Sequence, residues 1–531
     1  MTTMTYGLRR DCINSLGIPV DNLSLSQAVE RVIEMAKKHD GHARLVSTLN
    51  VDFLVNSLGC GFSSPRHPEL LNVLRESDMV TADGFPIVWL SKIAGKPLKA
   101  RVTGADMVPA LGVRAASEGL SLFLLGGAEG SAVGAAEILQ ATNPGLVIAG
   151  TSAPMIHTVG RELIDFVEDD EALLKQINES GANILLVGLG NPKQELWFNR
   201  NRHKLTVPVS IGVGGSFEFI NGTTARAPAW LQKMNLEWVY RITQDPIRLW
   251  KRYAIGGMKL AVLTAPLIYF RLKELLLYRR PEATQRRELQ WQTVWSSRDQ
   301  SLGVLRLPPI VSRYYLEELV DELQSESEGT ALRLLDFSHV KHIDAAGHGE
   351  FFRLTEILHD PQASTSLLGM PKSVRRHLAA SRVFDVVGHS HSQMGNTLTA
   401  LSSSPDASSV QEIGCQSYVM AETTLIFLSG RVSGDGLAGL GFLECLEHSA
   451  RDRTCIIDMR NVTLLESTAI AKLQPVIDDM HQRSSGAIMV SGAGTNVQQM
   501  FRMTGLSESV ISIDDKTLLA AIAPEGLGHE S

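Results

Sequence analysis

Long apolar runs are missing from this sequence. No stretch reaches roughly 18 uninterrupted apolar residues, the length that spans a bilayer, and the N-terminal MTTMTYGLRRDCINSLGIPV lacks the apolar core of a signal peptide. The nearest approach, AIGGMKLAVLTAPLIYF at 254–270, contains Lys259 and has basic flanks. Such a segment favours a helix lying in a membrane interface, and the alternative is a helix packed on its own domain or on a partner subunit. The sequence leaves both open.

Cysteine is scarce, and no charge sign dominates. Five scattered cysteines without CxxC spacing indicate neither a zinc site nor a disulfide framework, which favours a reducing cytoplasm. The net charge of −7 and the pI near 6.1 give no reason to expect a nucleic-acid partner. With 531 residues, the chain is long enough for about three or four domains.

The first half of the chain alternates short apolar runs with amphipathic stretches. From 16 to 255 this pattern predicts an α/β domain with a Rossmann-like fold. The clearest strands are LFLLGG at 122–127, ILLVGLG at 184–190 and VPVSIGVGG at 207–215, and each contains glycine at its end. Because open α/β sheets bind ligands at the carboxyl ends of parallel strands, we expect the functional site there.

Two breaks divide the rest of the chain. A basic, polar segment reads as a linker, and the Ser-rich LSSSPDASS at 401–409 separates two further modules. We therefore predict a domain with membrane-proximal C-terminal helices over 1–277, a linker over 278–300, and small α/β modules over 301–400 and 410–525.

The two small modules share a sequence pattern. In 332–354 and again in 455–473, a buried strand ends in Asp, a short turn follows, and small residues open an amphipathic helix. Asp336 and Asp458 hold the same place in this pattern. The pattern predicts that the modules are distant repeats of each other.

Three polar residues follow strand-like runs early in the chain. Thr48 and Asn50 lie in STLNVDFLVNS, and Asp83 lies in VTADGFPIVW. At the mouth of a strand, and followed by Gly84, the Asp83 carboxylate can approach a substrate and act as a general base. The alternative is an Asp that caps the helix predicted after it.

Glycine-rich turns supply candidates for binding a phosphate-containing ligand. In LFLLGGAEGSAVG, Gly126 and Gly127 precede a helix whose N-terminal amides can face a diphosphate. Lys193 and Gln194 in VGLGNPKQELW offer polar contacts to a nucleotide, and Glu218 lies in GVGGSFEF. Each turn alone could be ordinary turn chemistry. The glycine spacing is not the full dinucleotide fingerprint, which argues against a dinucleotide-dependent oxidoreductase.

These motifs, in this order, resemble the WecG/TagA/CpsF glycosyltransferase family. The resemblance covers nearly half of the chain and rests on TxN, ADG, RVTGADM, VGLGxPKQExW, GVGGSFxF and LEWVYRxxQxPxRLWKRY. It implies an inverting enzyme of bacterial surface or exopolysaccharide synthesis. Such an enzyme moves a hexose or N-acetylhexosamine-type sugar from a UDP-sugar to a polyprenyl-diphosphate-linked acceptor. The resemblance also implies that Asp83 is the general base and that Thr48, Asn50, Arg101 and Gln194 are polar active-site positions.

Two features depart from the family pattern. Glu218 stands where the family usually has Asp, so the carboxylate survives with a longer reach. An insertion-like stretch, CGFSSPRHP at 60–68, separates Asn50 from Asp83. Both departures concern specificity more than the class of reaction.

The departing diphosphate in such a reaction needs stabilisation, which many nucleotide-sugar transferases achieve with a metal held by a DxD motif. No Asp-any-Asp triplet occurs in this sequence, so we expect a metal-independent enzyme without a cofactor. Arg241, Arg248 and Arg252 are spaced seven and four apart and would share one face of a helix. The resemblance implies that this region closes over the donor diphosphate near the membrane, and the alternative is a solvated basic face.

The two small modules resemble STAS domains. The resemblance rests on the repeated strand, Asp, turn and helix pattern and on GAGTNVQQMFRMTGL at 492–506, and it implies protein partners. Phosphorylated members carry a serine after an Asp at the helix start, where this chain has Glu466 and Ser467. Ser467 is therefore the candidate phosphorylation site, and the alternative is a helix N-cap in a passive module.

A regulatory scaffold that has lost transfer activity and acts through its STAS-like modules is the competing function. Loss of Asp83 or of the arginines would favour the scaffold, and all of these residues are present. We expect a cytoplasmic enzyme bound peripherally to the inner face of the cell membrane.

Overall fold

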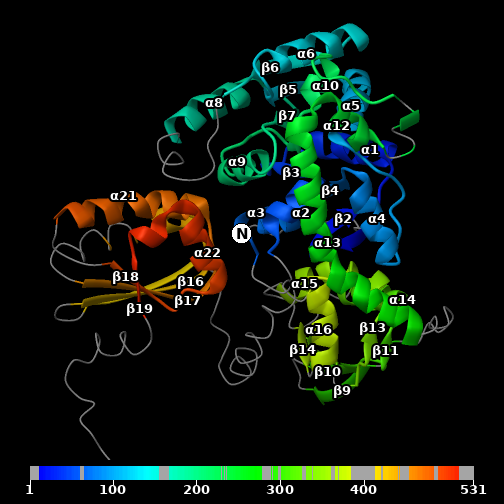
Figure 1. Cartoon of the computed structure of the whole chain (residues 1–531). Coiled ribbons are helices and arrows are strands. Elements are labelled where there is room, and N and C mark those ends of the chain that lie inside the picture. Colours follow the sequence, from blue (N-terminus) through cyan, green and yellow to red (C-terminus); the bar gives the residue numbers. More distant parts are fainter. Residues whose placement is uncertain are drawn as a thin grey trace, which may run out of the picture.

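Three bodies make up the computed structural model: an N-terminal domain and two smaller ones, which we call the first and second tail modules (Figure 1). The structure describes residues 11–59, 65–154 and 167–228 and, with short gaps, 230–277, 289–383 and 413–513. The predicted Ser-rich break at 401–409 lies outside these ranges. No helix within them is both long and apolar enough to cross a lipid bilayer.

A six-stranded sheet forms the centre of the N-terminal domain. Its strand order is β4-β3-β8-β7-β5-β6, and all neighbouring strands are parallel. The three strands predicted most clearly are β5, β7 and β8 of this sheet. In chain order the domain contains β1 (Cys12–Ser15), β2 (Ile18–Asp21), α1 (Leu25–Ala36), β3 (Arg44–Leu49), α2 (Val51–Ser57), α3 (Pro68–Glu76), β4 (Met79–Ala82), α4 (Phe85–Ile93), α5 (Gly104–Glu118), β5 (Ser121–Gly126), α6 (Ser131–Thr142), β6 (Val147–Ser152), α8 (Val167–Glu179), β7 (Ile184–Gly188), α9 (Lys193–Asn201), β8 (Val209–Gly212) and α10 (Ser216–Ile220).

Helices cover both faces of the sheet. Along β5, Leu122 and Leu124 pack with α1, α5 and α6 on one face, whereas Phe123 and Leu125 pack with α8 and α9 on the other. Successive strand residues point to opposite faces, so a strand buried on both sides must be apolar throughout. The predicted α/β fold with a parallel sheet is confirmed.

Two helices follow this core and do not form one continuous rod. α12 spans Glu237–Gln244 and α13 spans Pro246–Leu277. Asp245 between them has φ −141° and ψ 76°, because a proline disfavours the helical conformation at the residue before it. The prediction that Arg241, Arg248 and Arg252 share one helix face is therefore wrong, since the first lies on α12 and the other two on α13.

One face of α13 packs on the N-terminal domain. Leu260, Leu263 and Leu267 are buried in a cluster that includes Leu49 and Phe53. For this face, the alternative of a helix packed on its own domain is confirmed. In Figure 1, α13 continues downward from the N-terminal domain to the first tail module.

The two tail modules share one sheet design. The strand order is β14-β12-β10-β9 in the first module and β18-β17-β16-β15 in the second, which adds β19 beside β18. In each module an antiparallel pair, β9 with β10 or β15 with β16, is followed by parallel strands. Asp336 ends β12, whereas β17 continues beyond Asp458 to Leu465, so the prediction that the strand ends at its Asp is wrong for the second module. The shared strand order supports the predicted repeat.

The elements of the first module are β9 (Trp291–Ser296), β10 (Ser301–Arg306), β11 (Ile310–Val311), α14 (Arg313–Ser325), β12 (Ala331–Asp336), β13 (His342–Ile343), α15 (Glu350–His359), β14 (Thr365–Leu368) and α16 (Lys372–Ala380). Those of the second are β15 (Ile413–Val419), β16 (Thr423–Val432), α19 (Gly434–Gly439), β17 (Thr454–Leu465), α21 (Ser467–Arg483), β18 (Ile488–Ser491), α22 (Thr495–Thr504) and β19 (Ile511–Ile513).

Strand β9 falls inside the segment predicted as the linker 278–300 and pairs antiparallel with β10. The linker prediction is therefore wrong over 291–296. The segment WQTVWS contains Trp, Thr and Val, which favour strands, and this preference outweighs its polar surroundings.

Both tail modules contact the N-terminal domain. From the first module, the Ser381 carbonyl accepts a hydrogen bond from Asn14 Nδ2 at 2.9 Å. From the second, Arg431 Nη1 lies 2.7 and 2.8 Å from the two carboxylate oxygens of Glu76 on α3. The structure therefore joins the tail to the N-terminal domain by direct polar contacts on two sides.

Candidate active site

The predicted motifs meet at the carboxyl edge of the parallel sheet. The carboxyl ends of strands β3, β4, β5, β7 and β8 all lie at this edge, because these strands run parallel to one another in one sheet. Backbone hydrogen bonds join the segments that follow them: Asp83 N–H donates to the Leu49 carbonyl at 2.8 Å, and Gly127 N–H donates to the Gly188 carbonyl at 2.9 Å. The candidate site thus lies where the strand pattern predicts it.

Asp83 directly follows β4 and is half-buried. Gly84 is the N-cap of α4, and no side chain caps that helix, so Asp83 does not have the capping role that the sequence left open. Burial raises the pKa of Asp83 to about 6, while the positive charges of Arg241 and Arg101 oppose the rise. A carboxyl group with this pKa, at the mouth of a strand, is suited to accept a proton near neutral pH.

Glu237 bridges two arginines beside Asp83. Its Oε2 atom lies 3.2 Å from Arg101 Nη1, and its Oε1 atom lies 3.1 Å from Arg241 Nη2. The Arg241 guanidinium also lies 4.7 Å from the centroid of the Phe219 ring. Since each guanidinium has five N–H donors, the bridge fixes both arginines and leaves further donors for an anionic ligand.

Sequence reasoning missed Glu237 and two other charged residues of this cluster. Asp106 accepts a hydrogen bond from Thr103 Oγ1 at 2.8 Å and pairs with Arg226. All three lie inside the motifs LEWVYR, RVTGADM and GTTARAPAW. The available signal was the presence of opposite charges within motifs that converge on one sheet edge.

Thr48 and Asn50 both have structural roles at this edge. Thr48 is 3% exposed, and its hydroxyl donates to the Gly212 carbonyl at 2.8 Å, which ties β3 to the end of β8. Asn50 is the N-cap of α2, and its side-chain oxygen accepts from Asp52 N–H and Phe53 N–H. Asn50 is half-buried, and its side-chain amide nitrogen has no hydrogen-bond partner within the described residues.

Glu218 holds the glycine turn that follows β5. Its Oε1 atom accepts a hydrogen bond from Ala128 N–H at 2.8 Å. Gly126 has φ +94°, and a Cβ placed there would lie 2.9 Å from the Gly188 carbonyl carbon, so only glycine fits. Gly127, with φ +82°, lies beside Glu218.

This turn leads into α6, which has no side-chain cap at its N-terminus. The first amide of α6, Ser131 N–H, donates to the Ala128 carbonyl at 2.9 Å, so the amides that follow it are the ones that remain available to an anion. Glu218 shapes the predicted donor-binding turn through a backbone hydrogen bond.

A second polar group follows β7. Gln194 Oε1 accepts from Gly214 N–H at 3.1 Å, and Gln194 Nε2 donates to Glu195 Oε1 at 2.7 Å. Glu195, which sequence reasoning passed over, is fully buried, and burial raises its pKa to about 8, so it is largely protonated at neutral pH. Lys193 at the start of α9 is half-buried and has no salt bridge within the described residues.

The remaining two candidate arginines lie on α13. Arg252 pairs with Asp52 of α2, so its charge is already matched by a residue of the N-terminal domain. The side chain of Arg248 lies outside the described residues. Of the two candidate arginines whose side chains the structure describes, Arg241 is the one that acts electrostatically on Asp83.

Comparison with known proteins defines the class of this site. The family model described as Glycosyl transferase WecG/TagA/CpsF family matches residues 13–273. Three curated relatives are each named N-acetylglucosaminyldiphosphoundecaprenol N-acetyl-beta-D-mannosaminyltransferase. The relative from Bacillus spizizenii is 32% identical over 192 residues, 36% of this chain and 70% of its own length. The relative from Bacillus subtilis is 30% identical over 208 residues, which are 39% of this chain and 74% of the relative.

The third relative, from Staphylococcus aureus (strain MW2), is 29% identical over 247 residues, which are 46% of this chain and 88% of the relative. The enzyme defined by these matches is a glycosyltransferase. The chain belongs to the WecG/TagA/CpsF family.

Two solved structures of anti-sigma factor antagonists also match part of the chain. SpoIIAA in its unphosphorylated form matches with a TM-score of 0.19 and 11% identity, covering 21% of this chain and 99% of that one. The antagonist from Mycobacterium paratuberculosis matches with a TM-score of 0.19 and 16% identity, covering 22% of this chain and 99% of that one.

Proposed function

We propose that this enzyme transfers an N-acetylmannosamine-type sugar from a UDP-sugar to a polyprenyl-diphosphate-linked acceptor, with inversion and without a metal. The single observation that carries the proposal is the position of Asp83, a half-buried acid with a pKa of about 6 beside two arginines at the sheet edge. The names of the relatives support the acceptor, since each denotes transfer to N-acetylglucosaminyldiphosphoundecaprenol.

In the proposed reaction, Asp83 takes the proton of the acceptor hydroxyl as its oxygen attacks the anomeric carbon of the donor sugar. The bond from that carbon to the diphosphate breaks on the opposite face, which inverts the anomeric configuration, and UDP leaves with the electron pair. In this proposal, Arg241 and the N-terminus of α6, which has no side-chain cap, stabilise the negative charge that grows on the diphosphate.

Donor and acceptor are assigned to opposite sides of the site. The turn at Gly126 and Gly127, held by Glu218, and the polar pair Lys193 and Gln194 form the proposed donor side. Arg101 and the free amide of the Asn50 side chain lie on the Asp83 side and are proposed to position the acceptor.

The test is a transfer assay with purified protein, a panel of UDP-sugars and a short-chain lipid-diphosphate N-acetylglucosamine acceptor. We expect transfer from UDP-N-acetylmannosamine to continue in excess EDTA, because arginines and helix amides replace the metal in this proposal. A requirement for magnesium or manganese that restores activity after chelation would contradict the metal-independent reaction. Absence of transfer from every UDP-sugar would favour the regulatory scaffold.

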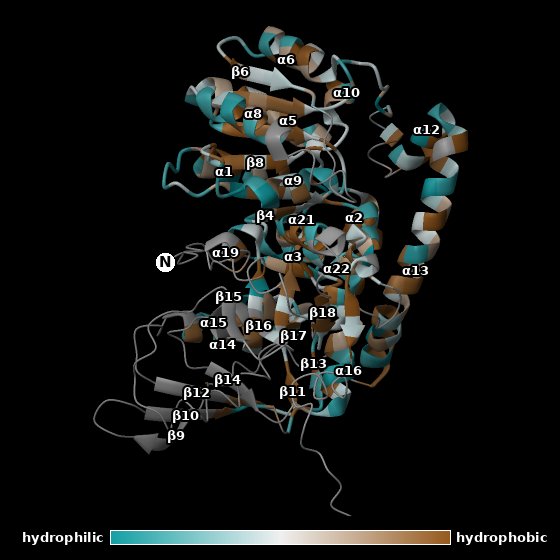
Figure 2. Ribbon diagram, turned by 90° about the vertical axis from the view of Figure 1, so that its left-hand side faces the viewer, coloured by the Kyte–Doolittle hydropathy of each residue, from teal (hydrophilic) through white to brown (hydrophobic). Residues whose placement is uncertain are grey.

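The membrane is the proposed location of this reaction, because α12 and α13 expose apolar side chains beside basic ones. On α13, Ile247 is 82% exposed, Trp250 60% and Met258 71%, while Lys251 and Arg252 lie between them. Figure 2 shows α12 and α13 along one side of the molecule, with hydrophobic (brown) and hydrophilic (teal) residues alternating along their ribbons. An amphipathic helix with basic residues suits the surface of an anionic bilayer.

A triple variant in which Ile247, Trp250 and Met258 are each changed to serine should co-sediment much less with phosphatidylglycerol vesicles, because the exposed apolar area is lost. The matched control replaces Val113 and Val133, which are exposed on α5 and α6 away from this face. Binding of the wild-type protein should also fall with added salt. Equal binding by both variants would place membrane attachment elsewhere.

We also propose that Ser467 is a regulatory position, because it lies between the second tail module and the N-terminal domain. Ser467 Oγ donates to Glu69 Oε1 at 2.9 Å, and Ser467 N–H donates to Glu69 Oε2 at 3.2 Å. α21 begins at Ser467 itself, so the hydroxyl serves another domain in addition to any local role at the helix start. Phosphate added to this oxygen would place two negative groups together and separate the domains.

A further inference from the structure

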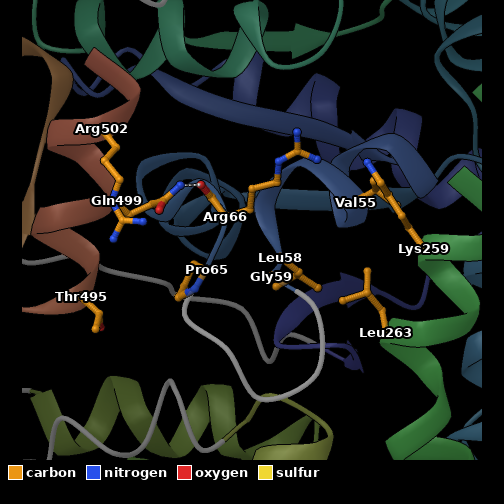
Figure 3. A pocket seen from close by; sticks show the side chains of 10 residues that line it. All are labelled: Val55, Leu58, Gly59, Pro65, Arg66, Lys259, Leu263, Thr495, Gln499 and Arg502. Carbon is orange, nitrogen blue, oxygen red and sulfur yellow. Dashed lines mark hydrogen bonds between the residues drawn. The ribbon is translucent and has the colours of Figure 1, made fainter. Parts of the chain in front are cut away.

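A cavity of about 370 Å³ lies where the N-terminal domain, α13 and the second tail module meet. Figure 3 shows Lys259 and Leu263 entering from α13 on one side and α22 residues on the opposite side, with Val55, Leu58 and Arg66 between them. The α22 residues, Thr495, Gln499 and Arg502, are spaced four and three apart and therefore lie on one helix face.

The charged residues that line this cavity are all cations. They are Arg66, Lys259 and Arg502, and among the described residues no Asp or Glu lines the cavity. None of the three forms a salt bridge with a carboxylate within the described residues. Cations gathered around one cavity repel one another, and an anion bound among them relieves that repulsion. The cavity is therefore built for a negatively charged group.

The floor of the cavity is apolar. Val55, Leu58 and Leu263 are each less than 10% exposed and contribute aliphatic side chains. A volume of this size holds a small ligand group, and an apolar wall beside cations suits a molecule with a charged head and an apolar tail. Arginine binds phosphate oxygens with two parallel hydrogen bonds, which makes phosphate the head group that fits best.

A ligand in this cavity would contact both sides of a domain interface. Arg66 belongs to the N-terminal domain and Arg502 to the second tail module. The two parts already meet here, since Gln499 Nε2 donates to the Arg66 carbonyl at 3.0 Å. A phosphate held by both arginines would strengthen this contact.

We propose that the cavity binds a phosphate-headed amphiphile, which holds the second tail module against the N-terminal domain. The site is distinct from the sheet edge that contains Asp83, and the proposal does not depend on the transfer reaction. The chemistry fits either an isoprenoid diphosphate or a phospholipid, and soluble short-chain forms of both can be compared.

The test uses the full-length protein and three probes: farnesyl diphosphate, dihexanoyl phosphatidylglycerol and inorganic pyrophosphate. Calorimetry should show that at least one amphiphile binds more tightly than pyrophosphate. Arg66→Gln/Arg502→Gln should weaken that binding at least about tenfold, because two charge-assisted contacts are lost. Both arginines are exposed, so the folded core is unaffected. The matched control, Lys38→Gln/Lys372→Gln, removes two exposed charges elsewhere and should bind as the wild type does.

Hydrogen–deuterium exchange locates the bound probe. Binding should slow exchange in α22 and near Arg66 in the wild type but not in the double variant. Equal binding by wild type and double variant, or protection confined to the Asp83 edge, would overturn the proposal. If pyrophosphate bound as tightly as the amphiphiles, the proposed contribution of an apolar tail would be overturned. Sugar transfer by the wild type is measured in a separate assay. Neither arginine belongs to the active site, so the presence or absence of transfer tests the proposed reaction and not the proposed cavity ligand.

Discussion

Asp83→Asn is expected to lower kcat by about 10²- to 10⁴-fold, the usual contribution of a general base. The substitution keeps the size and polarity of the side chain and removes its ability to accept the acceptor proton. Arg101 and Arg241 remain bridged by Glu237, so both the proposed acceptor side and the proposed donor side should keep their geometry. Single-turnover transfer with a saturating UDP-sugar measures the loss, and titration with UDP checks that donor binding persists.

The pH profile gives an independent measure of the same group. Asp83 must be deprotonated to act as a base, and burial raises its pKa to about 6. The kcat/KM of the wild type should therefore rise with pH through about 6 and level off above it. Near-wild-type turnover of Asp83→Asn, or a profile without this rise, would remove Asp83 from the role of base.

Ser467→Asp is expected to release the second tail module from the N-terminal domain. Ser467 is 6% exposed and donates to Glu69, which is itself buried. Burial raises the pKa of Glu69 to about 7, and the negative charge of Glu466 makes a smaller contribution in the same direction. A third carboxyl group at this point would be buried beside Glu69 and Glu466, and the nearby Arg431 guanidinium is already paired with Glu466 and Glu76. A buried charge without a partner of its own is strongly unfavourable.

Small-angle scattering measures this release as a larger radius of gyration, and faster amide exchange in α3 reports it locally. Ser467→Ala is the matched control, since it removes one hydrogen bond, keeps Ser467's backbone contact and adds no charge. Docking of the wild type should weaken as pH rises through about 7, because the raised pKa of Glu69 favours the docked state only while Glu69 is protonated. Compact Ser467→Asp protein at pH 8 would exclude this switch.

The sequence predicts well that the candidate residues gather at one sheet edge, because that arrangement follows from the strand pattern alone. Strands β5, β7 and β8 carry uninterrupted apolar runs, and polar motifs after such runs must gather at one sheet edge. Asp83 stands there as predicted. The helix break before Pro246 was also open to prediction, since it depends only on a local backbone rule.

The partners of polar side chains could not be predicted in the same way. The Thr48 hydroxyl bonds to the carbonyl of Gly212, and Ser467 bonds to Glu69, which is 398 positions away in sequence. Such pairs depend on how distant elements pack, and a residue type alone does not reveal whether its polar group faces a ligand or a neighbouring strand. Glu218 illustrates this, because its carboxylate holds a backbone amide of the glycine turn.

The length of α13 fixes how the first tail module faces the enzyme. Leu263 is packed in the N-terminal domain, while Phe270 stacks on His377 at 5.3 Å and Glu274 Oε1 lies 3.4 Å from His342 Nε2 in the first tail module. One unbroken helix carries both sets of contacts. Each residue of a helix adds about 100° of rotation and about 1.5 Å of rise. A single residue inserted between Leu263 and Phe270 would therefore rotate the module by about a quarter of a turn around the helix axis. An insertion of seven residues would nearly restore its orientation about that axis. The mutual orientation of the two parts is thus encoded in a residue count.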